Sequence, residues 1–241
     1  MSHVEGRRLY LLPVWLGEAG GTEQLPPENI AIVRTLDLFF CEHEKTARRM
    51  LRRMVADVDL ERIELHRLDK DTTPSEVEEL IAQITPARHG AVLSEAGMPG
   101  IADPGAALVR TAHRHGVEVV PLIGPSSLFL ALAASGLNGQ RFIFHGYLPV
   151  KSTERIAALK RCESDALRTG SAQLFIETPY RNEPLLKDLL DHCSPNTLLT
   201  IAIDLTQPGG TVVTRSIDTW RKQPPVLGKR PAVFIIGTAH S

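Results

Sequence analysis

The stretch Leu93–Gly105 reads L-S-E-A-G-M-P-G-I-A-D-P-G and decides the fold. It follows the apolar run Gly90–Leu93, which predicts a buried strand, and it precedes the helix-like run Ala106–His115. A loop in this position lies at the carboxyl edge of a sheet, where open α/β sheets bind ligands. Its glycines and prolines favour special backbone conformations that let a ligand approach closely. An ordinary strand-to-helix loop is the alternative interpretation.

Around this stretch, predicted strands alternate with predicted helices, which indicates a parallel α/β sheet of about five strands that ends near Ile123. The turn after the first strand carries Pro13 and several glycines but lacks the G-x-G-x-x-G dinucleotide fingerprint. The predicted strands are Leu9–Val14, Leu38–Cys41, Ile63–His66, Gly90–Leu93 and Val117–Ile123. The predicted helices are Ile30–Leu36, Thr46–Val55, Thr73–Ile84 and Ala106–His115.

After Ile123 the pattern changes. Gly124-Pro125-Ser126-Ser127 leads into an apolar helix that ends at Ser135, and Gln207-Pro208-Gly209 predicts a hairpin turn. A hairpin implies a mixed sheet, so we predict two α/β domains, residues 1–123 and 124–241. Strands are predicted at Phe142–Leu148, Ala172–Glu177, Thr197–Ile203, Gly210–Thr214 and Ala232–Ile236, and helices at Ser152 to about Cys162 and at Leu185–His192.

Composition argues against several classes of protein. The net charge of -1 over 241 residues argues against a strongly basic surface, although a local patch is compatible with it. One such patch is predicted on the helix Thr46–Val55, where Arg48, Arg49, Arg52 and Arg53 either steer a phosphate-bearing substrate or simply form a solvated face. The three cysteines predict neither disulfides nor a zinc site, so we expect a protein of the reducing cytoplasm. The polar start Met1–Arg8 does not resemble a signal peptide, and no apolar run is long enough for a membrane span.

Four motifs together carry a resemblance. They are S-E-A-G-M-P-G-I-A-D-P-G, G-P-S-S, F-H-G-Y-L-P-V-K at Phe144–Lys151, and F-I-E-T-P-Y-R at Phe175–Arg181. In order and spacing they resemble the tetrapyrrole methylase superfamily, the class III S-adenosylmethionine-dependent methyltransferases. Within it they are most similar to the ribosomal RNA small-subunit methyltransferase I group. The resemblance covers about Leu9 to Gly237 and implies a methyltransferase.

The resemblance implies a two-domain fold in which S-adenosylmethionine lies folded in a cleft between the domains. It places methionine and ribose contacts on Leu93–Gly105 and adenine contacts near Glu177, and it implies a homodimer without a metal. Small residues suit such a site because backbone groups then reach the cofactor directly. The implied cofactor residues are Pro13, Ala96, Gly97, Met98, Ile101, Ser126, Ser127, Glu177, Thr178, Pro231 and Ala232, with Val233 beside them. On this basis we expect Gly97→Val to block the cofactor without unfolding the chain.

For a sugar 2'-hydroxyl acceptor, the resemblance leaves Asp103, Lys151 and Arg181 as candidates to orient the acceptor or its phosphate, although a helix-cap or ion-pair role explains Asp103 equally well. The chain departs from the family pattern after the second strand, where His43-Glu44-Lys45 replaces an acidic-threonine-arginine run, at Glu95 for aspartate, and at Tyr180 for histidine. Three readings stay open: a ribosomal RNA methyltransferase, a methylase of a tetrapyrrole or other small metabolite, and a non-catalytic S-adenosylmethionine-binding module.

Overall fold

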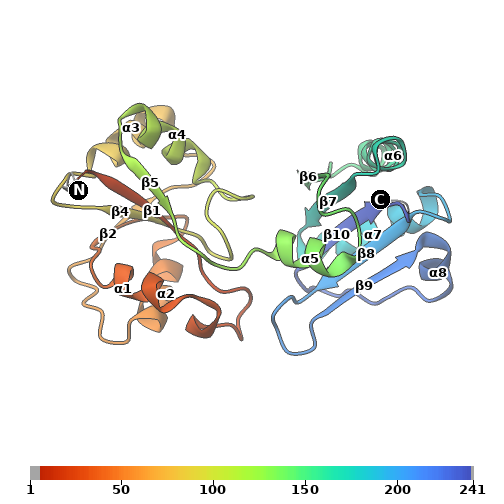
Figure 1. Cartoon of the computed structure of the whole chain (residues 1–241), viewed down its shortest axis with the longest axis horizontal. Coiled ribbons are helices and arrows are strands. Elements are labelled where there is room, and N and C mark those ends of the chain that lie inside the picture. The colour runs from red at the N-terminus through yellow and green to blue at the C-terminus, as the bar shows by residue number, and fades with distance from the viewer. Residues whose placement is uncertain (1–5, 240–241) are drawn as a thin grey trace. The chain divides into compact units, whose positions relative to one another are not determined.

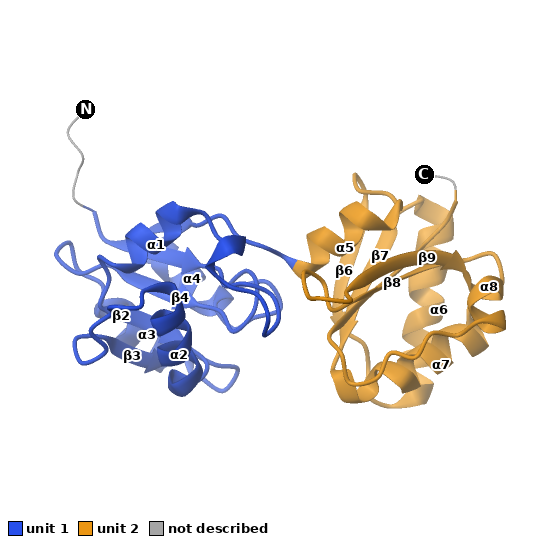
Figure 2. Ribbon diagram, turned by 90° about the horizontal axis from the view of Figure 1, so that it is seen from below, with its two compact units in different colours: residues 1–126 blue, residues 127–241 orange. Residues whose placement is uncertain are grey.

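The computed structural model describes residues 6–239 and divides the chain into two compact units, residues 1–126 and 127–241 (Figure 2). Each unit has its own sheet and its own hydrophobic core (Figure 1). The division follows Ser126, three residues beyond the predicted boundary after Ile123.

In the first unit, strands and helices alternate along the described chain. Its elements are β1 (Arg8–Leu12), the 3-10 helix η1 (Thr22–Gln24), α1 (Pro27–Val33), β2 (Leu38–Cys41), α2 (Glu44–Met54), β3 (Glu64–Arg67), α3 (Pro74–Ala82), β4 (Gly90–Leu93), α4 (Ala106–Arg114) and β5 (Glu118–Pro121).

The sheet of the first unit has the order β3-β2-β4-β1-β5 and every pairing is parallel, which confirms the predicted parallel sheet. Helices α1 and α2 pack on one face and α3 and α4 on the other (Figure 1). Strand β4 lies at the centre, between β1 and β2, and all four of its residues are buried. The stretch after β4 therefore leaves the middle of the carboxyl edge.

The second unit opens with an apolar helix and ends with a buried strand. Its elements are α5 (Ser127–Ser135), β6 (Phe142–Tyr147), α6 (Ser152–Thr169), β7 (Ala172–Glu177), the 3-10 helix η2 (Pro179–Arg181), α7 (Asn182–His192), β8 (Leu198–Ile203), β9 (Thr211–Ser216), α8 (Ile217–Lys222) and β10 (Ala232–Gly237).

The second sheet has the order β6-β7-β10-β8-β9 and is mixed, as predicted. Strands β6 and β7 are parallel, β10 runs antiparallel to both β7 and β8, and β8 and β9 form the predicted hairpin. Helix α5 covers one face, and α6, α7 and α8 cover the other. The prediction for α6 was too short, and α8 was not predicted.

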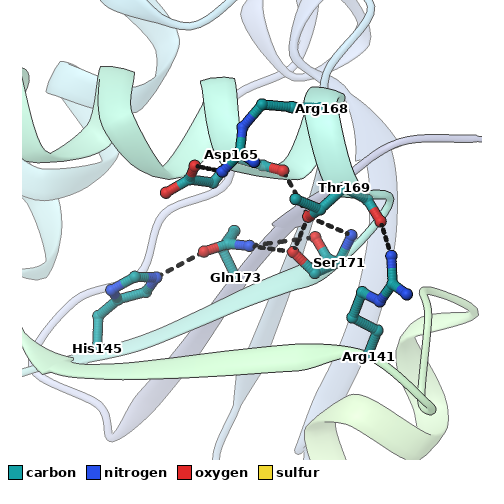
Figure 3. A network of polar contacts seen from close by, with 7 residues as sticks. All are labelled: Arg141, His145, Asp165, Arg168, Thr169, Ser171 and Gln173. Atoms are coloured by element: carbon teal, nitrogen blue, oxygen red, sulfur yellow. Dashed lines mark hydrogen bonds and ion pairs between the residues drawn. The ribbon is translucent and has the colours of Figure 1, made fainter.

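Polar side chains also join elements of the second unit. Gln173 on β7 is fully buried, and its amide oxygen lies 2.7 Å from His145 Nε2 on β6 (Figure 3). Its amide nitrogen donates to Ser171 Oγ, which contacts Thr169 Oγ1 at the end of α6. A chain of hydrogen bonds thus fixes β6 and β7 against the end of α6.

Candidate functional site at the carboxyl edges of the two sheets

The loop after β4 is organised by Asp103. One carboxylate oxygen accepts hydrogen bonds from the backbone amides of Gly100 and Gly105, both at 3.2 Å, and the other accepts from Ser94 Oγ at 3.1 Å. Ser94 is buried, so Asp103 joins the end of β4 to the start of α4. Among the roles considered for Asp103, this geometry supports the loop-capping one.

The same loop turns its backbone outward with few side chains in the way. Gly97, Gly100 and Ala102 have positive φ angles of 70°, 76° and 56°. A Cβ at Gly100 would meet no atom within 4 Å, and the side chain of Ile101 is 45% exposed. Ala96 is exposed as well. Near Gly100 the loop therefore has room for a ligand to approach its backbone, and its part in a binding site stays a prediction.

Gly97 is held more tightly than the sequence suggested. Its carbonyl accepts a hydrogen bond from the Val14 amide at 3.0 Å, and a Cβ would lie 3.2 Å from the Pro125 carbonyl oxygen. At a φ of 70°, a β-branched side chain is strained in any surroundings. Gly97→Val would therefore strain the loop as well as fill space, so Ala96 is the better position for a steric test.

Pro13 lies at the end of β1, next to the end of β5. It is buried, and a Cβ at Gly124 would come within 2.3 Å of the Pro13 ring. Glycine at position 124 is thus required for this close approach. Ser126 closes the first unit and Ser127 begins α5, and both are half-buried.

A histidine and a carboxylate that were not among the candidate site residues meet at the same edge. His43 follows β2 and Glu95 follows β4, and His43 Nδ1 lies 2.7 Å from Glu95 Oε1. Burial raises the pKa of the neighbouring Glu42, and the negative charges of Asp103 and Glu95 raise it further. The signal in the sequence was that both members of the pair depart from the family pattern.

At the end of β7 the polar groups are buried. The side chain of Glu177 is 0% exposed, and its Oε1 accepts from the Thr178 amide at 2.6 Å and pairs with Arg181 Nη2 at 2.5 Å. Glu177 Oε2, Arg181 Nη1 and Asn182 Oδ1 are buried without a hydrogen-bond partner among the described residues. Buried polar atoms of this kind cost free energy unless something else satisfies them.

The structure brings several predicted adenine-side residues together here. Ala232 pairs with Glu177 across β10 and β7, and the exposed Pro231 precedes it. Asn182 Nδ2 donates to the Arg230 carbonyl at 2.7 Å, which fixes this segment to the start of α7. Val233 is buried in the core beside Ile176.

The two cationic candidates of the second unit differ. Arg181 is tied to Glu177, whereas the Lys151 side chain is 79% exposed and lies 3.5 Å from Glu154 in the first turn of α6. Only Arg181 therefore lies with the residues grouped around Glu177 at the end of β7.

The four arginines of α2 fall into two pairs with different surroundings. Arg53 stacks over the Trp15 ring at 4.4 Å and donates to the Gly20 carbonyl, and the half-buried Arg48 donates to the Leu60 carbonyl at 3.3 Å. Arg49 and Arg52 are exposed. The prediction of four exposed arginines is therefore wrong for Arg48, and Arg53 has a structural role in the turn after β1.

The three cysteines are buried and reduced. Burial raises the pKa of Cys41 and Cys193 to about 12 and of Cys162 to about 11, so these thiols are poor nucleophiles at neutral pH. Within residues 6–239 we find no cluster of histidine, cysteine and carboxylate side chains with the geometry of a metal site. No helix in this range has the length and apolar character needed to span a bilayer.

Comparison with known proteins gives the family. The model of the tetrapyrrole (corrin/porphyrin) methylases matches residues 19–219. A ribosomal RNA small subunit methyltransferase I of Xylella fastidiosa is 32% identical over 217 residues, covering 89% of this chain and 74% of that protein. The protein of the same name from Escherichia coli O157:H7 is 31% identical over 205 residues, covering 85% and 68%.

Solved structures agree with the fold. The methyltransferase CobJ superimposes with a TM-score of 0.61 at 21% identity, covering 97% of this chain and 95% of that one. Uroporphyrin III C-methyl transferase from Thermus thermophilus gives 0.58 at 19% identity, covering 95% and 97%. Both the parallel sheet and the mixed sheet are thus those of a known methyltransferase architecture, and the chain belongs to the tetrapyrrole (corrin/porphyrin) methylase family and is a methyltransferase.

Proposed function

We propose that this protein transfers a methyl group from S-adenosylmethionine to a sugar 2'-hydroxyl of ribosomal RNA. The observation that carries the proposal is the loop after β4, where positive φ angles at Gly97 and Gly100 and the open space beside Gly100 suit the close approach of a ligand to the backbone. Relatives named ribosomal RNA small subunit methyltransferase I are 32% and 31% identical to this chain. A sulfonium donor already carries an activated methyl group, so the protein mainly has to bind and align two reactants.

The residues of the loop fit such a donor. Ala96 and Ile101 are exposed beside the open space at Gly100, so methionine and ribose groups would meet backbone amides and carbonyls rather than bulky side chains. The predicted adenine contacts around Glu177 and Ala232 are supported by the buried, unpartnered polar atoms there, because a ligand with donors and acceptors would satisfy them. The contacts predicted for Pro13, Ser126 and Ser127, and the predicted cleft, stay predictions.

Two exposed features support an RNA acceptor. Arg49 and Arg52 on α2 present positive charge that suits phosphates. In the second unit, the Tyr180 side chain is 76% exposed and Lys229 Nζ lies 5.0 Å from its ring centroid. An aromatic ring beside a lysine is suited to stacking with an unpaired base next to its phosphate.

The test uses the purified full chain and S-adenosylmethionine with a labelled methyl group. Small ribosomal subunits, naked small-subunit RNA and a tetrapyrrole are offered in separate reactions. We expect label in RNA at a nucleotide that then resists alkaline cleavage, because a 2'-O-methyl group cannot attack the adjacent phosphate. Label in the tetrapyrrole alone would support the small-metabolite reading, and cofactor binding without transfer to any acceptor would support the non-catalytic one.

We further propose a cytoplasmic homodimer. The three buried, unpaired thiols suit a reducing compartment. Strand β6 is an edge strand, and Ile143 and Tyr147 on it are exposed together with Phe129 of α5, which packs edge-to-face with Phe142. A second copy of the chain would cover these apolar side chains. Light scattering that gives the mass of one chain at high concentration would contradict the dimer.

A further inference from the structure

Two positions at which the chain departs from the family pattern touch each other. The parallel register aligns Cys41 with Leu93, and two residues later on each strand His43 and Glu95 are in contact. We propose that His43 accepts the proton of the acceptor hydroxyl during methyl transfer, and that Glu95 positions the imidazole. This inference rests on the proposed function, since it assigns a proton acceptor for a hydroxyl substrate.

The contact fixes which ring nitrogen is free to take a proton. An ionised carboxylate only accepts hydrogen bonds, so Nδ1, 2.7 Å from Glu95 Oε1, carries the hydrogen in the neutral imidazole. Nε2 then has a lone pair. The His43 side chain is 69% exposed and that of Glu95 is 39% exposed, so a substrate has access to the ring.

The position of the pair sets it apart from an ordinary surface ion pair. Glu95 is adjacent to Ala96 and two residues from Gly97, in the loop that the proposed function assigns to the methyl donor. The other nearby carboxylate of the loop, Asp103, already accepts three hydrogen bonds that hold the loop together. His43 and Glu95, in contrast, contact each other and are both accessible, so they remain available to a hydroxyl substrate.

Several charged side chains lie near His43. Glu42 and Glu44 belong to the same segment as His43, Glu95 and Asp103 come from the loop after β4, and Asp69 follows β3. Burial raises the pKa of Glu42, and the carboxylates of Asp103 and Glu95 raise it further, whereas Lys45 and Arg48 bring positive charge to the same segment. In the proposed step, the Glu95 carboxylate in contact with Nδ1 is the group that offsets the charge of the proton taken up at Nε2.

The proposed step is balanced in atoms and charge. The hydroxyl oxygen forms a bond to the methyl carbon, and the carbon–sulfur bond breaks with its electron pair staying on sulfur, which becomes a neutral thioether. The hydroxyl proton moves to His43 Nε2. Imidazolium then releases it to solvent, which restores the starting state.

The kinetic test compares His43→Gln with a matched control. Glutamine keeps a polar side chain but cannot take up a proton, so we expect kcat to fall by about 10² or more, with KM for RNA little changed. The rise of kcat/KM with pH that reports loss of the imidazole proton should disappear. The control is His115→Gln, because His115 also pairs with a carboxylate, Glu78, at 2.6 Å and its side chain is 44% exposed, but it lies after α4. A His43→Gln rate within about threefold of wild type, with the same pH profile, overturns the proposal.

A second measurement does not depend on turnover. Nitrogen-15 NMR of the imidazoles in the full chain should show His43 as the Nδ1–H tautomer, and Glu95→Gln should shift its resonances while those of His115 stay in place. A predominant Nε2–H tautomer of His43 overturns the proposal even if the enzyme is active. If the wild-type chain methylates no RNA, the proposed acceptor fails, and the NMR result still decides whether the pair is arranged as inferred.

Discussion

The carboxyl ends of β4 and β7 are both followed by a polar segment, but the two segments satisfy their polar groups differently. After β4, Asp103 accepts hydrogen bonds from two backbone amides and one hydroxyl, and the loop is internally complete. After β7, the segment 177–182 keeps three buried polar atoms without partners among the described residues. The first segment thus satisfies the Asp103 carboxylate within its own loop, whereas the second has buried donors and acceptors that another group could satisfy.

The largest effect is expected at the end of β7. Glu177→Ala leaves the Arg181 guanidinium, which is only 24% exposed, without its carboxylate, and we expect a loss of about 3 kcal/mol in the free energy of unfolding. Glu177→Gln keeps an acceptor for Arg181 and the Thr178 amide, so its cost should be about 1 kcal/mol. Urea unfolding of the three proteins measures this, and equal stabilities would mean that the pair is not buried in solution.

The second-largest effect is expected at the end of β4. Asp103→Ala removes all three hydrogen bonds of the loop, and we expect a loss of about 2 kcal/mol in unfolding free energy together with weaker binding of the methyl donor. Asp103→Asn retains one carbonyl acceptor for the two amides and should lose less of both. If Asp103→Ala binds the donor as tightly as wild type, the loop does not need this carboxylate for its shape.

A smaller change tests whether the loop meets the donor at all. Ala96→Leu adds bulk at an exposed position, so the stability should stay the same while the Kd for S-adenosylmethionine rises about tenfold. Calorimetric titration gives the Kd, and thermal unfolding gives the stability. Ala106→Leu, at an exposed position of α4, is the matched control. An unchanged Kd for Ala96→Leu would remove this loop from the donor site.

The smallest effect concerns pH. Because burial and neighbouring carboxylates raise the pKa of Glu42, its protonated form is favoured in the folded chain. Its contribution to stability is therefore present below the ordinary carboxyl range and is lost as the pH rises through the raised pKa. The stability gained by Glu42→Gln, measured by urea unfolding, should thus be larger above the raised pKa than in the ordinary carboxyl range. A difference that shrinks as the pH rises would contradict the sign.

The sequence was sufficient for the buried strands and insufficient where tertiary contacts decide. Strand β4 and its loop follow directly from an apolar run next to glycines and prolines. Helix α6 continues past Cys162 because Glu163, polar by type, is buried and accepts a hydrogen bond from the Ser194 amide at 2.7 Å. Helix α8 begins directly after β9, and Ser216 is both the last residue of that strand and the N-cap of the helix. Its capping role was therefore not recognised in the sequence.

The candidate site, too, could be predicted from the sequence only in part. The motifs predicted which loops matter, and the group around Glu177 and Ala232 is brought together as expected. The pair His43–Glu95 required the strand order, because only the pairing of β2 with β4 makes residues 52 positions apart neighbours. The alternation of strands and helices along the chain is compatible with several strand orders, so it did not bring these two residues together.

The central place of β4 has a consequence for synthesis on the ribosome. Strands β1 and β2 do not pair with each other, since β4 lies between them. A nascent chain that has emerged only as far as α3 therefore carries two apolar strands that lack their common neighbour, and their unpaired edges invite aggregation. Arrival of Gly90–Leu93 supplies hydrogen bonds to both at once, so folding of the amino-terminal half should start abruptly when this short segment leaves the exit tunnel.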